Sequence, residues 1–218
     1  MTARRPLLLW LVALAASISV PACAVTDPTQ YYALGQVGTG KTDAVTSPPS
    51  PANPATAQAS QGGTSAVAIG VGPVFLPGYL DRLQIVTRTG TDQVDLSQFY
   101  RWAEPLDEGI ARVLVEEIGA RVPTDRIVTY PWRGAIGRAI QYQVPVGILR
   151  FDGHQGGEIV LDARWRILAR DGTELAFRRS TLTETVAGQG YEPMVAAMTR
   201  ALLNLGQEIA AEMRTLPH

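Results

Sequence analysis

Alternating apolar and polar residues in the second half of the chain predict β-strands. In the clearest run, from Glu158 to Leu168, nearly every second side chain is apolar. The Asp171-Gly172 dipeptide marks a tight turn before a second run, from Glu174 to Glu184. We therefore expect an antiparallel hairpin with one buried and one solvated face. Shorter runs predict further strands over Ala66–Val71, Leu83–Thr89, Gln93–Tyr100, Arg126–Tyr130 and Tyr142–Phe151.

Two other segments have the spacing of amphipathic helices. One begins at Pro105, which suits a first helical turn, and ends at Gly119. The other begins near Pro193 and carries apolar residues at helical intervals as far as Met213. The chain is therefore expected to form a single α+β domain, in which a mixed or antiparallel β-sheet packs against two α-helices on one face.

The first 22 residues have the pattern of an export signal. Arg4 and Arg5 precede an apolar run, Leu7–Val20, which is too short to span a bilayer as a helix. The junction Val20-Pro21-Ala22-Cys23 resembles a bacterial lipobox, whose cysteine becomes the lipid-bearing first residue of the mature chain. An ordinary signal peptide with a free thiol is the alternative, although an unpaired cysteine is unfavourable in an exported protein. We predict residues 1–22 as a lipoprotein signal peptide and Cys23 as the lipidation site, with palmitate among its chains.

The stretch between this anchor and the domain lacks apolar periodicity. Residues 23–35 are expected to form a lipid-anchored N-terminus that contains a short strand at Tyr31-Tyr32-Ala33-Leu34. Residues 36–65, rich in Pro, Gly and Ser, are predicted to be a linker or loop, and residues 66–218 the globular domain. The stretch Gly35–Thr42 matches the phosphate-loop pattern G-x-x-x-x-G-K-[ST], but Pro48 follows too soon for the helix that such a loop requires. We expect no nucleotide site there.

Composition and charge exclude several classes of function. The net charge of −1 gives no basic excess for binding nucleic acid. One cysteine and two histidines cannot build a cysteine- or histidine-ligated zinc site, and we expect neither a metal nor a cofactor. No G-x-S-x-G elbow occurs, and His154 lies in a glycine-rich turn, where a solvated role is commoner than a catalytic one. The chain is therefore not expected to be an enzyme.

Four arginines share or flank the predicted hairpin: Arg164, Arg166, Arg178 and Arg179. Guanidinium groups bind phosphate and carboxylate groups, so this cluster could contact lipid headgroups or an acidic partner. A solvated face without a binding role is the commoner meaning of such a charge cluster. Both interpretations stay open for these residues.

Short motifs follow one another along the mature chain: Cys23, Tyr31-Tyr32-Ala33-Leu34, Arg101-Trp102-Ala103-Glu104-Pro105-Leu106, Pro131-Trp132, Phe151-Asp152-Gly153 and Leu161-Asp162-Ala163-Arg164-Trp165-Arg166-Ile167. Together with the C-terminal amphipathic helix, this order resembles the PqiC/YmbA-type auxiliary lipoproteins of ABC-transport and MCE lipid-trafficking systems. The resemblance covers almost the whole mature chain. The Pro-rich insertion after Tyr31-Tyr32 is the departure from the family pattern.

The resemblance implies a lipoprotein on the periplasmic face of the outer membrane that performs no chemistry. It would serve as an auxiliary or docking subunit of a lipid-transport system and so support membrane integrity. Its partners would be an MCE-domain protein and the associated inner-membrane transport components, and a homo-oligomer is left open. Two other functions also stay open. One is an outer-membrane assembly lipoprotein that binds lipopolysaccharide or a β-barrel partner, and the other is a periplasmic envelope enzyme.

Overall fold

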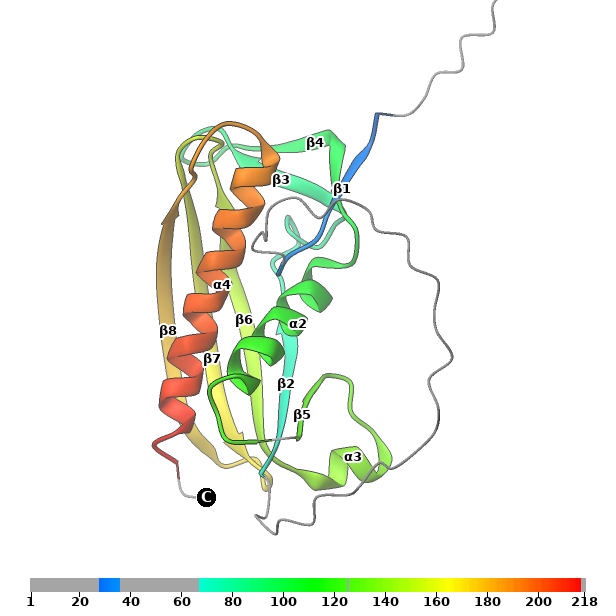
Figure 1. The fold of residues 1–218 in the computed structure, drawn as a ribbon, viewed down its shortest axis with the longest axis vertical. Helices are drawn as coiled ribbons and strands as arrows, with labels where there is room; N and C mark the ends of the chain where they lie inside the picture. Colours follow the sequence, from blue (N-terminus) through cyan, green and yellow to red (C-terminus); the bar gives the residue numbers. More distant parts are fainter. Residues whose placement is uncertain (1–27, 36–66, 125, 217–218) are drawn as a thin grey trace, which may run out of the picture.

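Two β-sheets and a layer of helices make up the described part of the computed structural model, residues 28–35, 67–124 and 126–216 (Figure 1). The fold is mixed α+β with two long helices on one face of a sheet, which confirms the predicted fold class. The structure adds a smaller second sheet of three strands to the single sheet that the sequence predicts. Among these residues, no helix has both the length and the apolar character needed to cross a membrane.

The larger sheet has five strands in the order β5-β2-β6-β7-β8. Three long strands form an antiparallel meander: β6 (Ile140–Gly153), β7 (Glu158–Ala169) and β8 (Glu174–Thr185). The strand β2 (Ala68–Phe75) pairs in parallel with both β6 and β5 (Arg126–Thr129). The alternating pattern of β7 is confirmed, because its inward apolar residues are all buried: Ile159, Leu161, Ala163, Trp165 and Ile167.

Two long helices cover the buried face of this sheet (Figure 1). Helix α2 (Leu106–Gly119) begins directly after Pro105, as predicted. Helix α4 (Tyr191–Met213) packs against α2 at Gly206, where an added Cβ would come within 2.7 Å of Glu117 Cγ. A close approach of the two helices therefore needs glycine at this point. The short helix α3 (Gly134–Ala139) was not predicted, since it buries no residue and so carries no apolar stripe.

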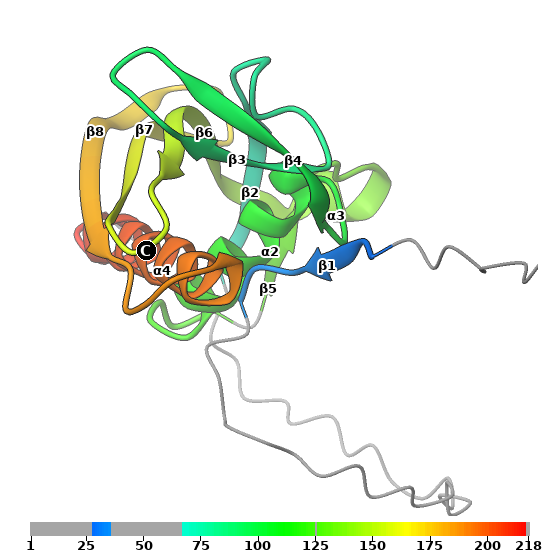
Figure 2. The ribbon, with the colours of Figure 1, turned by 90° about the horizontal axis from the view of Figure 1, so that it is seen from above.

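The smaller sheet has the order β1-β4-β3. Strands β3 (Gln84–Arg88) and β4 (Val94–Trp102) are antiparallel, and β1 (Gln30–Tyr32) pairs with β4 in parallel. Seen from above, the strands β3 and β4 lie on the opposite side of the molecule from α4 (Figure 2). The large sheet is therefore covered by helices on one side and partly by the small sheet on the other.

Candidate functional site

The N-terminal segment that contains β1 is docked on the two long helices. Leu34 is only 2% exposed and belongs to the hydrophobic core. Arg112 of α2 donates a hydrogen bond of 3.0 Å to the Leu34 carbonyl, and the backbone N–H of Gly35 donates one of 3.2 Å to Thr199 Oγ1 of α4. The predicted N-terminal strand is thus part of the folded domain. Cys23 lies outside the described residues, so its lipidation stays a prediction.

Three of the four candidate arginines share the outer face of the β7–β8 hairpin, which points away from α4. Arg164 lies directly across from Arg179 in the strand register. Arg166 lies across from Phe177, and its guanidinium carbon is 5.7 Å from the centre of that ring. The structure therefore brings these three cations together on one surface.

Arg178 and Arg179 both have strong partners within the fold. Arg178 points to the helix side and pairs with Glu212 of α4 at 2.9 Å. Arg179 forms a two-point ion pair with Asp162, at 2.6 and 2.9 Å, and these bonds hold the pKa of the Asp162 carboxyl below its ordinary value. Arg164 forms no hydrogen bond or ion pair with the described residues. It is therefore the arginine of this group best placed to meet a ligand or partner.

Beside Arg164 and Arg166 the outer face of the large sheet is hollowed into an apolar groove of about 380 Å³. We call it the arginine-rimmed groove, and its apolar walls come from β2, β6 and β8: Phe75, Pro145, Leu149 and Phe177. Phe75, the last residue of β2, is 61% exposed, and Phe177 of the edge strand β8 is 47% exposed, so two large apolar side chains meet solvent at one groove. Such a groove suits a segment that carries both apolar side chains and a carboxylate.

The fully buried carboxylate of Asp152, on β6, was not singled out as functional by the sequence analysis. Arg88 of β3 donates two hydrogen bonds to it, at 2.7 and 3.0 Å. Arg150 donates one at 2.9 Å, and the hydroxyl of Tyr79 donates another at 2.7 Å. These bonds join the small sheet to the large one. The one sign of Asp152 in the sequence was its position at the end of a predicted, mostly apolar strand.

Two groups of this cluster, Asp152 and Tyr79, have pKa values that are moved further from neutral pH. Burial alone would raise the pKa of the Asp152 carboxyl, but hydrogen bonds from Arg88, Tyr79 and Arg150 outweigh it and hold that pKa below its ordinary value. Burial and the bond to Asp152 raise the pKa of Tyr79 to about 12. Asp152 therefore stays ionised and Tyr79 stays a proton donor. Groups with such pKa values are poor general acids or bases near pH 7.

The remaining residues considered for chemistry have structural surroundings. His154 is exposed in the turn between β6 and β7. Trp102 is buried in the core, and Trp132 packs over Gly70, leaving no room there for a Cβ. Within the described ranges, no three His, Cys, Asp or Glu residues are grouped as metal ligands. The features of the described residues that suit binding are therefore surfaces.

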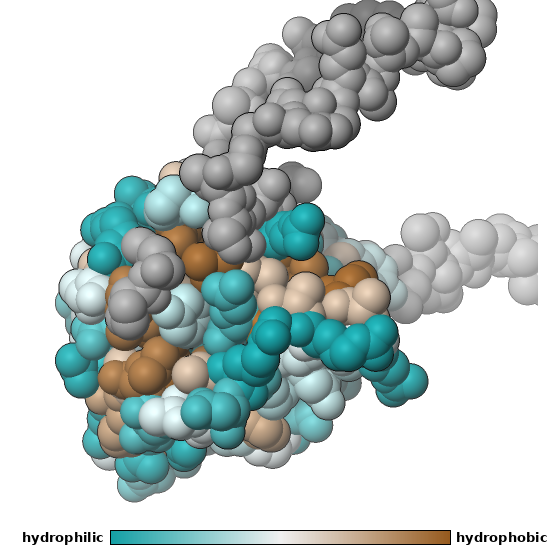
Figure 3. Space-filling view, turned by 90° about the horizontal axis from the view of Figure 1, so that it is seen from below, coloured by the Kyte–Doolittle hydropathy of each residue, from teal (hydrophilic) through white to brown (hydrophobic). Residues whose placement is uncertain are grey.

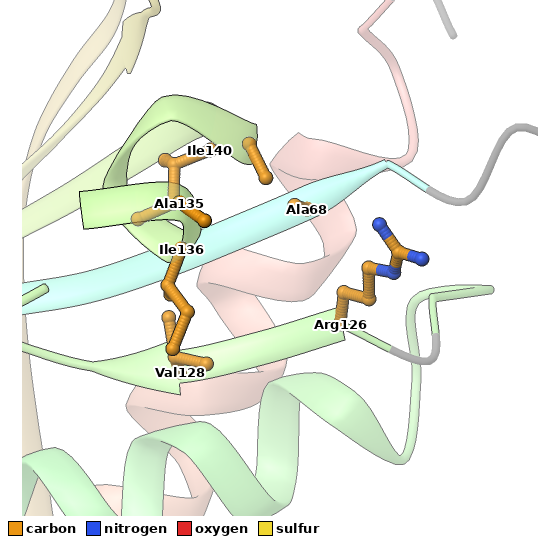
Figure 4. A pocket seen from close by; sticks show the side chains of 7 residues that line it. Ala68, Arg126, Val128, Ala135, Ile136 and Ile140 are labelled. Atoms are coloured by element: carbon orange, nitrogen blue, oxygen red, sulfur yellow. The ribbon is translucent and has the colours of Figure 1, made fainter. Parts of the chain in front are cut away.

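A second apolar hollow, of about 390 Å³, lies at the lower end of the molecule between α3, β2 and β5. Ile136 of α3 is directed toward Val128 of β5, and Arg126 stands at the other side of the hollow (Figure 4). Ile136 is 56% exposed. Seen from below, apolar side chains gather in patches among hydrophilic ones (Figure 3). This hollow has no arginine pair at its rim, in contrast to the arginine-rimmed groove.

The chain is similar to known proteins at the levels of family, sequence and fold. The model of a family described as "ABC-type transport auxiliary lipoprotein component" matches residues 50–210. The chain is 26% identical over 144 residues to the intermembrane transport lipoprotein PqiC of Escherichia coli strain K12, which covers 66% of this chain and 73% of that protein. The PqiC of Shigella flexneri matches to the same extent.

Two solved structures share the fold. An uncharacterized protein superimposes with a TM-score of 0.60 at 24% identity, covering 67% of this chain and 92% of that one. A protein from Xanthomonas campestris gives a TM-score of 0.55 at 15% identity, covering 68% of this chain and 86% of that one. Identities this low show that the fold is shared, and no more than that.

Proposed function

The chain belongs to the family of ABC-type transport auxiliary lipoprotein components, and from this membership we propose that it is a non-enzymatic docking subunit of an envelope lipid-transport system. Residues 1–22 are removed as a signal peptide, and lipid on Cys23 holds the domain at the periplasmic face of the outer membrane. The partner is an MCE-domain protein that works with inner-membrane transport components. The similarity to PqiC, whose name describes an intermembrane transport lipoprotein, supports this assignment.

The observation that carries the docking role is the arginine-rimmed groove. Phe75 and Phe177 expose large apolar surfaces that a partner would remove from water. Arg164 adds a cation that forms no hydrogen bond or ion pair with the described residues, which favours a carboxylate on the incoming segment. Aromatic and arginine residues are also the residue types that contribute most to protein interfaces. We therefore place the contact with the MCE protein at this groove.

In this proposal the protein is held on the membrane by its lipid and not by charge. Removal of the signal peptide takes away Arg4 and Arg5, so the mature chain keeps 17 basic and 20 acidic residues. A net negative chain gains nothing from anionic headgroups. Each buried methylene of an acyl chain contributes about 0.8 kcal/mol, and two or more chains hold a protein stably on a membrane.

The test is a pull-down from detergent-solubilised envelopes that compares wild type, a groove variant and a control variant. Wild type should enrich an MCE-domain protein. The Arg164→Glu, Phe177→Ser double variant should lower this enrichment about tenfold or more, because it loses an aromatic contact and reverses a charge at the interface. The matched control is Ile136→Ser, an exposed apolar residue at the lower hollow, which should leave the enrichment unchanged.

Each other outcome speaks against the proposal. If wild type enriches no MCE or ABC component, the transport role fails. Recovery of β-barrel proteins or lipopolysaccharide in its place would favour an outer-membrane assembly lipoprotein. A groove variant that binds as well as wild type would move the contact elsewhere. A Cys23→Ala chain that remains equally membrane-bound would disprove the lipid anchor.

A further inference from the structure

The proposed anchor emerges at one end of an elongated domain. Pro28, the first described residue, lies five residues after Cys23. An extended chain covers at most about 3.6 Å per residue, so Pro28 stays within about 18 Å of Cys23. Helix α4 has 23 residues and is therefore about 35 Å long. It runs from the β1 end of the molecule to the α3 end (Figure 1). The segment between Cys23 and Pro28 is shorter than the domain, so it keeps the β1 end beside the membrane.

Exposed apolar side chains occur on the two strands at this end. Tyr31 of β1 is 63% exposed, and Leu96 and Phe99 of β4 are 39% and 45% exposed. Phe99 precedes Tyr100, which pairs in register with the first residue of β1, so Phe99 lies close to the point where the chain leaves toward the anchor. Tyr32 packs inward against Tyr100, which leaves Tyr31 on the outer side of the strand. We call Tyr31 and Phe99 the anchor-side patch.

We propose that the anchor-side patch rests on the lipid bilayer, so that β1 and β4 lie against the membrane and the α3 end points away from it. This inference rests on the proposed lipidation of Cys23. Tyrosine suits this position, because its ring lies among acyl chains while its hydroxyl reaches the headgroups. The phenylalanine adds apolar surface that leaves water on contact. Because the side chains of the patch carry no charge, the contact is apolar and should be insensitive to salt.

The test uses the single cysteine of the chain. Once Cys23 carries lipid, a cysteine introduced elsewhere is the only free thiol. Purified lipidated Tyr31→Cys and Phe99→Cys variants are labelled with an environment-sensitive fluorophore and added to vesicles of phosphatidylethanolamine and phosphatidylglycerol. Matched controls are Ile136→Cys on α3 and Leu175→Cys at the start of β8, which are 56% and 38% exposed at the other end. Flotation reports the anchor, and quenching by spin-labelled lipid reports contact with the bilayer.

We expect labels at positions 31 and 99 to show a blue shift, a several-fold rise in emission and quenching by the spin-labelled lipid. Labels at positions 136 and 175 should behave as they do in water. If the protein floats with vesicles but the labels at 31 and 99 stay water-exposed, the patch is disproved while the anchor stands. If the protein does not float, the anchor itself fails. A signal that disappears in high salt would show an ionic contact and also overturn the proposal.

Discussion

Asp152 joins the two sheets through hydrogen bonds from three side chains, and its sequence neighbours are equally constrained. Phe151 is fully buried in the core. A Cβ at Gly153 would overlap the carbonyl oxygen of Glu158 on the neighbouring strand. The Phe151-Asp152-Gly153 motif, one of those behind the family resemblance, is therefore explained by packing and by the connection between the sheets. It requires no ligand.

Replacing Asp152 with Asn should lower the free energy of unfolding by about 3 kcal/mol, because Arg88 and Arg150 keep their charges but lose the carboxylate. The folded pKa of Asp152 lies below the ordinary value of 3.8. Its stabilisation is therefore complete above that pH and is lost as the pH falls through the lower folded value. In urea unfolding at a series of pH values, the difference in the free energy of unfolding between wild type and Asp152→Asn should become smaller below about pH 4.

The control for this prediction is Asp162→Asn. Asp162 also has a lowered pKa, but its partner Arg179 is largely exposed, so the loss should stay below about 1 kcal/mol. The role given to Asp152 is contradicted if Asp152→Asn lowers the free energy of unfolding no more than Asp162→Asn does. It is also contradicted if the loss in Asp152→Asn does not change with pH.

The role of a single residue could be predicted only where a local sequence pattern indicates it. The alternation of β7 identifies its buried side chains, because neighbouring positions on a strand point to opposite faces. The role of Asp152 could not be foreseen, since Arg88 and Tyr79 lie 64 and 73 residues earlier in the chain. Likewise, the separation of Arg178 from the other three arginines depends on the strand register and on Glu212 of α4.

At the scale of elements, the strands, the hairpin and both long helices followed from periodicity. The second sheet did not, because β1 pairs with a strand about seventy residues away and no local pattern specifies that pairing. Helix α3 was missed because six residues without a buried side chain carry no periodic signal. The sequence did indicate that the segment around Tyr31 joins the domain, from its strand-forming residues, although not where it docks.

The docking of the N-terminal segment can be measured through Leu34. Leu34→Ala should cost about 3 kcal/mol, because it leaves a cavity between α2 and the core. Thr199→Val should cost about 1 kcal/mol, since the Gly35 N–H loses its acceptor. Tyr31→Ala, on the exposed side of the same strand, should change stability by less than about 0.5 kcal/mol. Urea unfolding that ranks Leu34→Ala no higher than Tyr31→Ala would show that this segment does not contribute to the fold.

At the scale of the whole molecule, the candidate groove was only half visible in the sequence. Its cationic rim was anticipated as an arginine cluster on a hairpin face. Its apolar walls were not, because Phe75 is brought beside β6 by the parallel pairing of β2 with β6, and Leu149 is brought beside β7 by the antiparallel pairing of β6 with β7. The extent of the small sheet, which determines how much of the outer face stays open, also depends on contacts far apart in the chain.

The phosphate-loop match gives a prediction about the chain as a whole. Lys41, the only lysine, lies outside the described residues, and Gly35 at the start of the match donates its N–H to Thr199. Lys41→Ala should therefore leave stability and partner binding unchanged, and ATP with magnesium should not shift the melting temperature of either protein. If ATP raises the melting temperature of wild type but not of Lys41→Ala, the chain does have a nucleotide site.

The position of β1 also has a mechanical consequence. In the proposed arrangement, a partner bound at the groove and lipid on Cys23 pull the protein in different directions. The force enters at β1, the described strand nearest Cys23 in the chain, and reaches β4 through the pairing of the two strands. The hydrogen bonds between the two strands and the buried side chain of Leu34 resist this force. The small sheet, together with the contacts of Leu34 and Gly35 with α2 and α4, is therefore the joint that carries tension between membrane and partner into the rest of the domain.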